Sequence, residues 1–136
     1  MYTEQTLKLT HRAVLTMLEA AVARAEEIGQ PQCIVIVDVS GETLGTLRMS
    51  GAKYLSLKSA RAKARTAASI NAPSNVIPED FGPLISAATG GEITRLGGGL
   101  PIVIDGHLVG GIGVGSGSAD QDIAVGEAAI AAISKS

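Results

Sequence analysis

The chain has 136 residues, of which 46% are hydrophobic, 18% charged and only 2% aromatic, and its formal net charge at pH 7 is −2. This length and composition predict one compact domain, residues 1–136, with a core of aliphatic residues and alanine. The weak negative charge and the few aromatic side chains argue against nucleic-acid binding, because phosphates would not be attracted and bases would find few rings to stack on.

The N-terminal stretch, MYTEQTLKLT, lacks the basic start and the apolar run of a signal peptide. No part of the chain approaches the roughly 18 uninterrupted apolar residues of a membrane-spanning helix, so we expect no membrane partner and a cytoplasmic protein. Within residues 3–28, apolar side chains recur at helical spacing, and Gly29 follows them. This pattern predicts an amphipathic helix.

A hairpin and a second helix are expected next. Within residues 33–49, two β-rich runs flank Ser40-Gly41, which is the pattern of a hairpin turn. Cys33, the only cysteine, opens the first apolar run, so we expect a buried and inert thiol. Residues 53–70 are rich in alanine and in basic side chains and predict a helix.

The middle of the chain is irregular before it returns to strands. Residues 71–91 are rich in proline and glycine and predict a loop with one short helical turn near Leu84. Residues 92–104 predict one or two short strands. Asp105-Gly106 is a strong signal for a two-residue hairpin turn into a further strand.

The last helix is expected over residues 118–136. Ser118 and Gln121 stand three residues apart at its start, which is the spacing of a capping box. The order of elements is therefore helix, two strands, helix, two or three strands, helix. Because hairpins connect the strands, we predict an α+β fold with a mainly antiparallel sheet and helices packed on it.

Glycine recurs on one face of the strand that follows the Asp105-Gly106 turn. Because side chains alternate between the faces of a strand, Gly111, Gly113, Gly115 and Gly117 share one face. Something must lie close to this backbone: the alanine-rich last helix, another subunit or a ligand. In the ligand hypothesis the pocket would be lined by Gly113 and Gly115 together with Gly98 and Gly99. A nucleotide site is not expected, because no G-x-G-x-x-G pattern is present.

Two histidines offer metal chemistry. His11 lies on or beside the apolar stripe of the first helix, where it is either a boundary residue or a ligand to haem iron or another metal. His107 follows the Asp-Gly turn and is expected to be exposed. Neither has a second histidine or cysteine at metal-site spacing, so a structural zinc site is not expected.

Basic residues concentrate in the second predicted helix. They usually form a solvated face, but Arg48, Lys63 and Arg65 are also suited to a carboxylate, either a haem propionate or a small organic acid. In an enzyme acting on such an acid, Thr66 would help to hold the carboxylate. Asp120 or Asp122 would then serve as the catalytic general base.

Three stretches resemble the GlcG/HbpS family, which includes the C-terminal domain of PduO-type proteins. They are VDVSGETLGTLRMSGA, KARTAA and GGGLPIVIDGHLVGGIGVGSGSADQD, and the likeness covers nearly the whole chain after residue 10. The resemblance implies a profilin-like fold, a five-stranded antiparallel sheet with helices on both faces. It also implies a homo-oligomer, and some members of the family bind haem. Ser50 stands where the family has an aspartate in its Arg-Met-Asp-Gly-Ala motif.

Three functional hypotheses follow from the residues and the resemblance together. The first is a small-ligand-binding protein whose cofactor is haem or a related tetrapyrrole, with His11 as axial ligand and Arg48 or Lys63 at the propionates. The second is a catabolic enzyme that acts on a small organic acid by lactone hydrolysis or isomerisation. The third is a structural or regulatory oligomer without a ligand. The sequence leaves open whether the protein is an enzyme.

Overall fold

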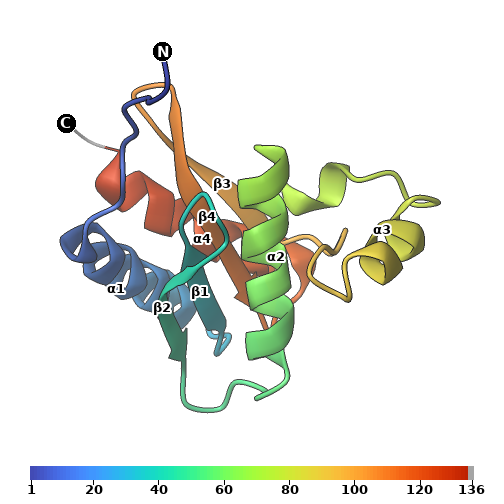
Figure 1. Ribbon diagram of the computed structural model, residues 1–136. Helices are drawn as coiled ribbons and strands as arrows, with labels where there is room; N and C mark the ends of the chain where they lie inside the picture. The colour runs from blue at the N-terminus through green and yellow to red at the C-terminus, as the bar shows by residue number, and fades with distance from the viewer. Residues whose placement is uncertain (135–136) are drawn as a thin grey trace.

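Four strands form one antiparallel sheet in the order β2–β1–β4–β3, and helices cover both of its faces (Figure 1). The strands are β1 (Cys33–Val37), β2 (Thr43–Arg48), β3 (Gly99–Ile104) and β4 (His107–Gly115). The helices are α1 (His11–Ile28), α2 (Ser56–Ile70), α3 (Gly82–Ala88) and α4 (Ala119–Ile133), with a short 3-10 helix η1 (Ser74–Val76). This computed structural model describes residues 1–134, and within them no helix is long and apolar enough to cross a membrane.

The α+β class and the antiparallel sheet are confirmed, but the sheet has four strands and not the five that the family resemblance implied. Of the one or two short strands expected in residues 92–104, the structure forms one, β3, and residues 92–98 form no strand. Their polar groups bind neighbouring segments instead. Thr94 N donates to Thr66 Oγ1 in α2 at 2.9 Å, and Leu96 O accepts from Ser74 Oγ in η1 at 2.5 Å.

The helix boundaries differ from the sequence pattern mainly at the N-terminus. α1 begins at His11 rather than at residue 3, because Thr10 is extended and its side chain accepts a hydrogen bond from Ala13 N at 3.2 Å. Residues 1–10 belong to no helix, and we call them the arm. At the other end, the capping box of Ser118 and Gln121 is confirmed, while residues 135–136 of the last predicted helix lie outside the described residues.

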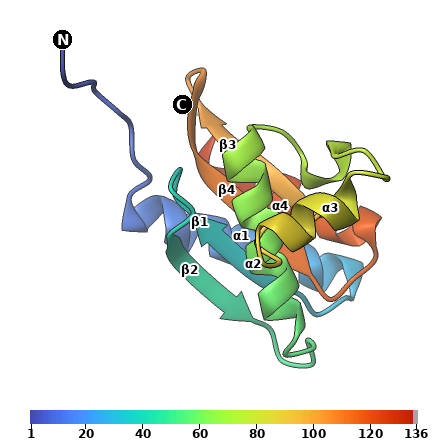
Figure 2. The same ribbon diagram turned by 45° about the vertical axis from the view of Figure 1, so that its right-hand side comes forward.

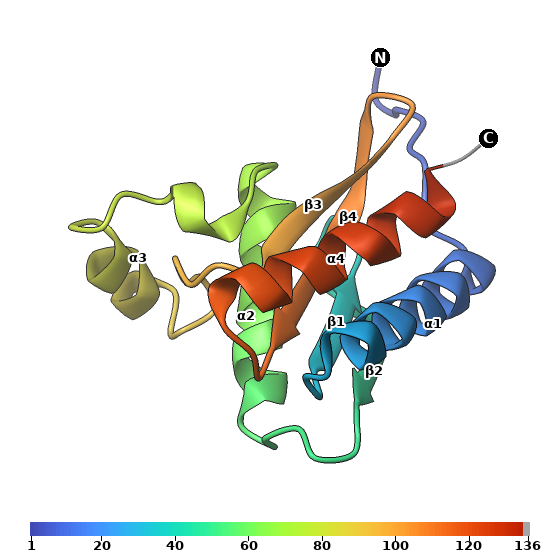
Figure 3. The same ribbon diagram turned by 180° about the vertical axis from the view of Figure 1, so that it is seen from behind.

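Two cores lie on opposite faces of the sheet. α1 and α4 run side by side over one face (Figure 3), and their core includes Met17, Ile34, Ile36, Ile112 and Val125. α2 crosses the other face, where its alanines pack on Cys33, Val35 and Val37. α3 lies on the far side of α2 from β2 (Figure 2). Because successive side chains of β1 alternate between these cores, all of its residues are buried.

The glycine face of β4 lies directly against α2. A Cβ on Gly113 would lie 2.6 Å from Ala64 N, and a Cβ on Gly115 would lie 3.0 Å from Ser56 O. A helix of the same chain therefore covers Gly111, Gly113 and Gly115, whereas Gly117 lies beyond β4, and a Cβ there would meet Gln32, Gln121 and Asp122. The expectation that α4 would cover them is wrong, because α4 packs on the opposite face, where Gly126 approaches the side chains of Leu100 and Val114.

The second hairpin turn is confirmed in its conformation as well as its place. Asp105 and Gly106 both have positive φ, at 50° and 77°, as a two-residue type I′ turn requires. The turn joins β3 to β4 and projects from the body of the protein beside the arm (Figure 1).

Candidate functional site

Lys63 and Asp122 meet in a buried ion pair, although one lies in α2 and the other in the first turn of α4. Lys63 Nζ donates to Asp122 Oδ2 at 2.9 Å and to Val114 O at 2.8 Å. Lys63 is only 5% exposed and Asp122 only 2%. Two residues that sequence reasoning placed in different roles, ligand binding and catalysis, are therefore neighbours in the interior.

Asp122 has further partners that complete the cluster. Gly117 N donates to its Oδ1 at 3.0 Å. The amide nitrogen of Gln32, oriented toward its acceptors, lies 2.7 Å from Asp122 Oδ1 and 2.7 Å from Gly115 O. Burial raises the pKa of Asp122, and the hydrogen bond and charge of Lys63 offset part of that effect. Within the described residues, every buried side-chain nitrogen and oxygen has a partner, so the cluster is internally satisfied.

Gly98 and Gly99 pack directly over this cluster. Gly98 has a φ of 121°, and a Cβ there would lie 2.7 Å from Val114 O and 3.1 Å from Lys63 Nζ. A Cβ on Gly99 would lie 2.9 Å from Ser74 Oγ. The loop before β3 can therefore approach α2 and β4 only without side chains at these positions. Gly98, Gly99 and Lys63 are brought together, but they pack on one another in the interior.

The structure does not bring the other polar candidates to one place. Asp120 is exposed on α4, and Arg48 is exposed at the end of β2. Thr66 is buried, where its Oγ1 donates to Ala62 O at 2.7 Å and accepts from Thr94 N. Among the described residues, no hydrogen bond or ion pair joins Arg48, Arg65 and Thr66 to one another or to either aspartate.

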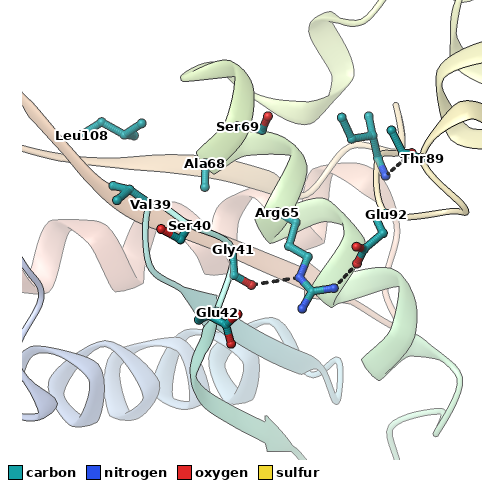
Figure 4. A pocket seen from close by; sticks show the side chains of 11 residues that line it. Val39, Ser40, Gly41, Glu42, Arg65, Ala68, Ser69, Thr89, Glu92 and Leu108 are labelled. Atoms are coloured by element: carbon teal, nitrogen blue, oxygen red, sulfur yellow. Dashed lines mark hydrogen bonds and ion pairs between the residues drawn. The ribbon is translucent and has the colours of Figure 1, made fainter.

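Arg65 lines a cleft of about 800 Å³ between α2, the turn after β1 and the segment after α3 (Figure 4). Its Nε donates to Gly41 O at 2.9 Å, and its guanidinium pairs with Glu92. The Arg65 cleft, as we call it, is lined by Val39, Ser40, Gly41, Glu42, Arg65, Ala68, Ser69, Thr89, Glu92, Ile93 and Leu108. It combines hydroxyl groups and apolar side chains with one cation and two carboxylates.

Two smaller clefts separate the arm from the β3–β4 hairpin. The first, of about 480 Å³, is lined by His107 and by Gln5, Thr6 and Leu7 of the arm. The second, of about 350 Å³, shares Leu7 with the first and is lined by Leu7, Lys8, Leu9, Thr10, Ala13, Ile104, Asp105, Val109 and Ile133. We call them together the arm–hairpin clefts. His107 is exposed as expected, and His11 is exposed at the start of α1.

Several residues of these sites escaped sequence reasoning. Gln32 precedes β1, and nothing in its neighbourhood signals a buried amide. Glu92 lies far from Arg65 in the chain, so their pairing depends on the path of the segment after α3. Leu7 falls within residues 3–28, for which the spacing predicts a helix, although it belongs to the arm. The sequence does carry a signal that excludes Leu7 from the helix. Thr10 is a good N-capping residue, so a helix capped by it begins after residue 10.

A family model described as "Haem degrading protein HbpS-like" matches residues 9–131 of the chain. Among curated proteins, the corrinoid adenosyltransferase PduO of Citrobacter freundii is 33% identical over 135 residues, which are 96% of this chain and 40% of that protein. This chain therefore spans about two-fifths of the length of that relative, and the name adenosyltransferase belongs to the longer protein.

Solved structures share this fold. The complex of PduOC with haem has a TM-score of 0.86 at 31% identity, and the match covers 93% of this chain and 96% of that one. A double mutant of HbpS from Streptomyces reticuli has a TM-score of 0.86 at 35% identity, with 96% of this chain and 90% of that one covered. Both likenesses extend over nearly the whole described fold.

Proposed function

The chain belongs to the HbpS-like family, and on that premise we propose that it is a small-ligand-binding protein whose ligand is haem or a closely related tetrapyrrole. The observation that carries most weight is the similarity to the solved PduOC–haem complex, which extends over almost all of both chains. A fold shared over that length includes the sheet and the helices on both of its faces.

The residues of this chain fit such a ligand. Haem needs an axial donor, apolar walls for the macrocycle and a polar or cationic edge for the propionates. The chain has two exposed imidazoles, His11 and His107, and His107 lines an arm–hairpin cleft. The neighbouring cleft supplies leucine, isoleucine and valine walls together with Lys8. When bound, haem would supply the iron centre and its redox chemistry, while this chain would supply the ligand, the walls and the counter-charge. We assign no reaction to the chain.

An absorption titration of the purified chain with hemin tests the proposal. We expect a saturable change of the Soret band at micromolar hemin, with an end point at equimolar haem. A parallel titration with protoporphyrin IX, followed by quenching of its fluorescence, shows whether the macrocycle alone is enough. If hemin produces only the linear, unsaturated change of free haem, the chain is not a haem-binding protein.

As a second candidate, we propose that the Arg65 cleft binds a small organic acid. The specific observation is an arginine side chain, 29% exposed, in a large cleft whose walls also carry the hydroxyls of Ser40, Ser69 and Thr89. Glu92 pairs with Arg65 and would have to yield to the ligand's carboxylate. Since neither Asp120 nor Asp122 lines this cleft, we propose binding there without a catalytic base.

Calorimetric titration with glycolate separates this second candidate from the first. Glu92→Gln removes the carboxylate that competes for Arg65 and should tighten glycolate binding, whereas Arg65→Met should abolish it. Hemin binding should be unaffected by Glu92→Gln. If glycolate and longer 2-hydroxy acids release no heat with either the wild type or Glu92→Gln, the Arg65–Glu92 pair is only a structural contact between α2 and the segment after α3.

We also propose that copies of the chain assemble with one another. β2 and β3 are the edge strands of the sheet, and Leu44 of β2 and Val103 of β3 are 41% and 40% exposed. Unpaired strand edges that carry apolar side chains are natural contacts between copies. Light scattering after gel filtration should report a mass above 13.8 kDa. A monomer at all concentrations would contradict assembly.

A further inference from the structure

We propose that His107, through its Nε2, is the axial ligand of the haem iron, and that the macrocycle lies between the arm and the β3–β4 hairpin. This inference rests on the proposed haem-binding function and adds to it the residue and the place. It differs from the expectation at the sequence level, which put His11 in that role and left His107 as an exposed turn residue.

The hydrogen bond of His107 sets its tautomer. Its Nδ1 lies 3.0 Å from Asp105 O. A carbonyl oxygen can only accept a hydrogen bond, so in the neutral imidazole Nδ1 carries the proton and Nε2 carries the lone pair. A backbone carbonyl that holds one ring nitrogen in this way is the usual support of a metal-binding histidine, because it orients the ring and raises its basicity. The positive φ of Asp105 and Gly106 fixes the turn that presents this carbonyl.

The clefts beside His107 offer apolar side chains and a cation to a haem group. Gln5, Thr6 and Leu7 stand across the cleft of about 480 Å³ that His107 lines. Leu7 continues into the neighbouring cleft, whose walls include Leu9, Ile104, Val109 and Ile133. Lys8 lines that second cleft and is the cation available for a propionate. A flat apolar ligand that spans the two neighbouring clefts would therefore have an imidazole in one cleft and a lysine in the other.

The other side chains that could donate to haem iron, His11 and Cys33, are placed less favourably than His107. His11 is exposed on α1 and lines neither of the arm–hairpin clefts. Cys33 is buried under α2, and burial raises the pKa of its thiol, so the thiolate that binds iron is disfavoured. The residues that line the Arg65 cleft include no imidazole and no thiol. Among the described residues, His107 alone combines a cleft with a preset tautomer.

The test compares His107→Ala with His11→Ala in hemin titrations. Both histidines are exposed, so neither change should disturb the fold, and each variant controls for the other. His107→Ala should lose the Soret position of the wild-type complex and weaken hemin binding at least about tenfold, since even the loss of an outer partner of a metal ligand costs about 10–100-fold in affinity. Added imidazole should restore the wild-type spectrum. His11→Ala should keep both spectrum and affinity.

A third variant tests the place of the macrocycle separately from the ligand. Leu7→Asp puts a charge in the wall shared by the two clefts, so it should weaken hemin binding while leaving the Soret position of the residual complex unchanged. Loss of the wild-type spectrum in His11→Ala with its retention in His107→Ala would overturn the assignment, as would retention in both. A wild type that gives no saturable change would instead refute haem binding itself, so the two failures are distinguishable.

Discussion

Replacing Lys63 by methionine should destabilise the protein severely, because it removes the cation beside a buried carboxylate. Methionine preserves most of the side-chain volume, so the change tests the charge and its hydrogen bonds rather than a cavity. Asp122 is 2% exposed and would keep only Gly117 and Gln32 as donors, while Val114 O would lose its bond from Nζ. Breaking a buried pair by removing one partner typically costs about 3–5 kcal/mol.

Urea denaturation followed by circular dichroism measures this loss at neutral pH. A loss of that size is a large fraction of the roughly 5–15 kcal/mol that stabilises a typical domain. The matched control is Lys58→Met, because Lys58 is an exposed lysine on the same helix, and its replacement should stay within about 0.5 kcal/mol of the wild type. The double variant with Lys63→Met and Asp122→Asn should lose less than the sum of the single losses, by about 0.5–3 kcal/mol.

A loss of less than about 1 kcal/mol in Lys63→Met, the size of an exposed ion pair, would contradict a strong buried pair. Additive losses in the double variant would also refute it, since they would show that the two charges do not interact. A marginally stable Lys63→Met protein can still be measured at low pH. There Asp122 takes up a proton, and the penalty of an unpaired carboxylate disappears.

Three further predictions follow from the same structure. Gly113→Val should lower the free energy of unfolding by about 1–3 kcal/mol or leave the protein insoluble, because the new side chain would meet the backbone of α2; an unchanged melting temperature would show that the face is open. Ser118→Ala should cost about 1 kcal/mol in urea denaturation by removing the acceptor for Gln121 N, and no loss would mean that the capping box contributes nothing. Burial raises the pKa of Asp122 above its ordinary value, so the stability that this carboxyl contributes is fully present below the pKa of the unfolded chain and is lost as the pH rises through the folded pKa. The unfolding free energy of Asp122→Asn should lack that decline across the acidic range, and a profile parallel to that of the wild type would contradict it.

Local chemistry made several elements predictable. The hairpin at Asp105-Gly106 and the capping box at Ser118 depend on residues that are adjacent or three apart. A few neighbouring residues therefore determine their conformation. The glycines of β4 likewise indicated that something lies close to the strand. They could not indicate whether it is a helix, a subunit or a ligand, because that depends on the order of strands and on which face each helix covers. α2 and not α4 covers them, and this is a property of the topology.

The same distinction applies to the candidate sites. Lys63 and Asp122 each stood out in the sequence, but their pairing joins residues 59 positions apart and turns two candidates for ligand chemistry into an internal contact. The arm was not predicted, because Leu7 continues the helical spacing of α1. The helix nevertheless begins only after its N-cap, Thr10. The resulting clefts beside His107 depend on how an irregular segment lies against a hairpin, which no periodic pattern records.

Gel filtration of the chain mixed with excess hemin tests the central claim most directly, when haem and protein are measured in the same fractions. We predict that haem co-elutes with the folded chain in equimolar amount, with the spectrum of an imidazole-ligated iron. Haem that elutes only in the small-molecule volume, or that co-elutes equally with the urea-denatured chain, would contradict haem binding by this fold.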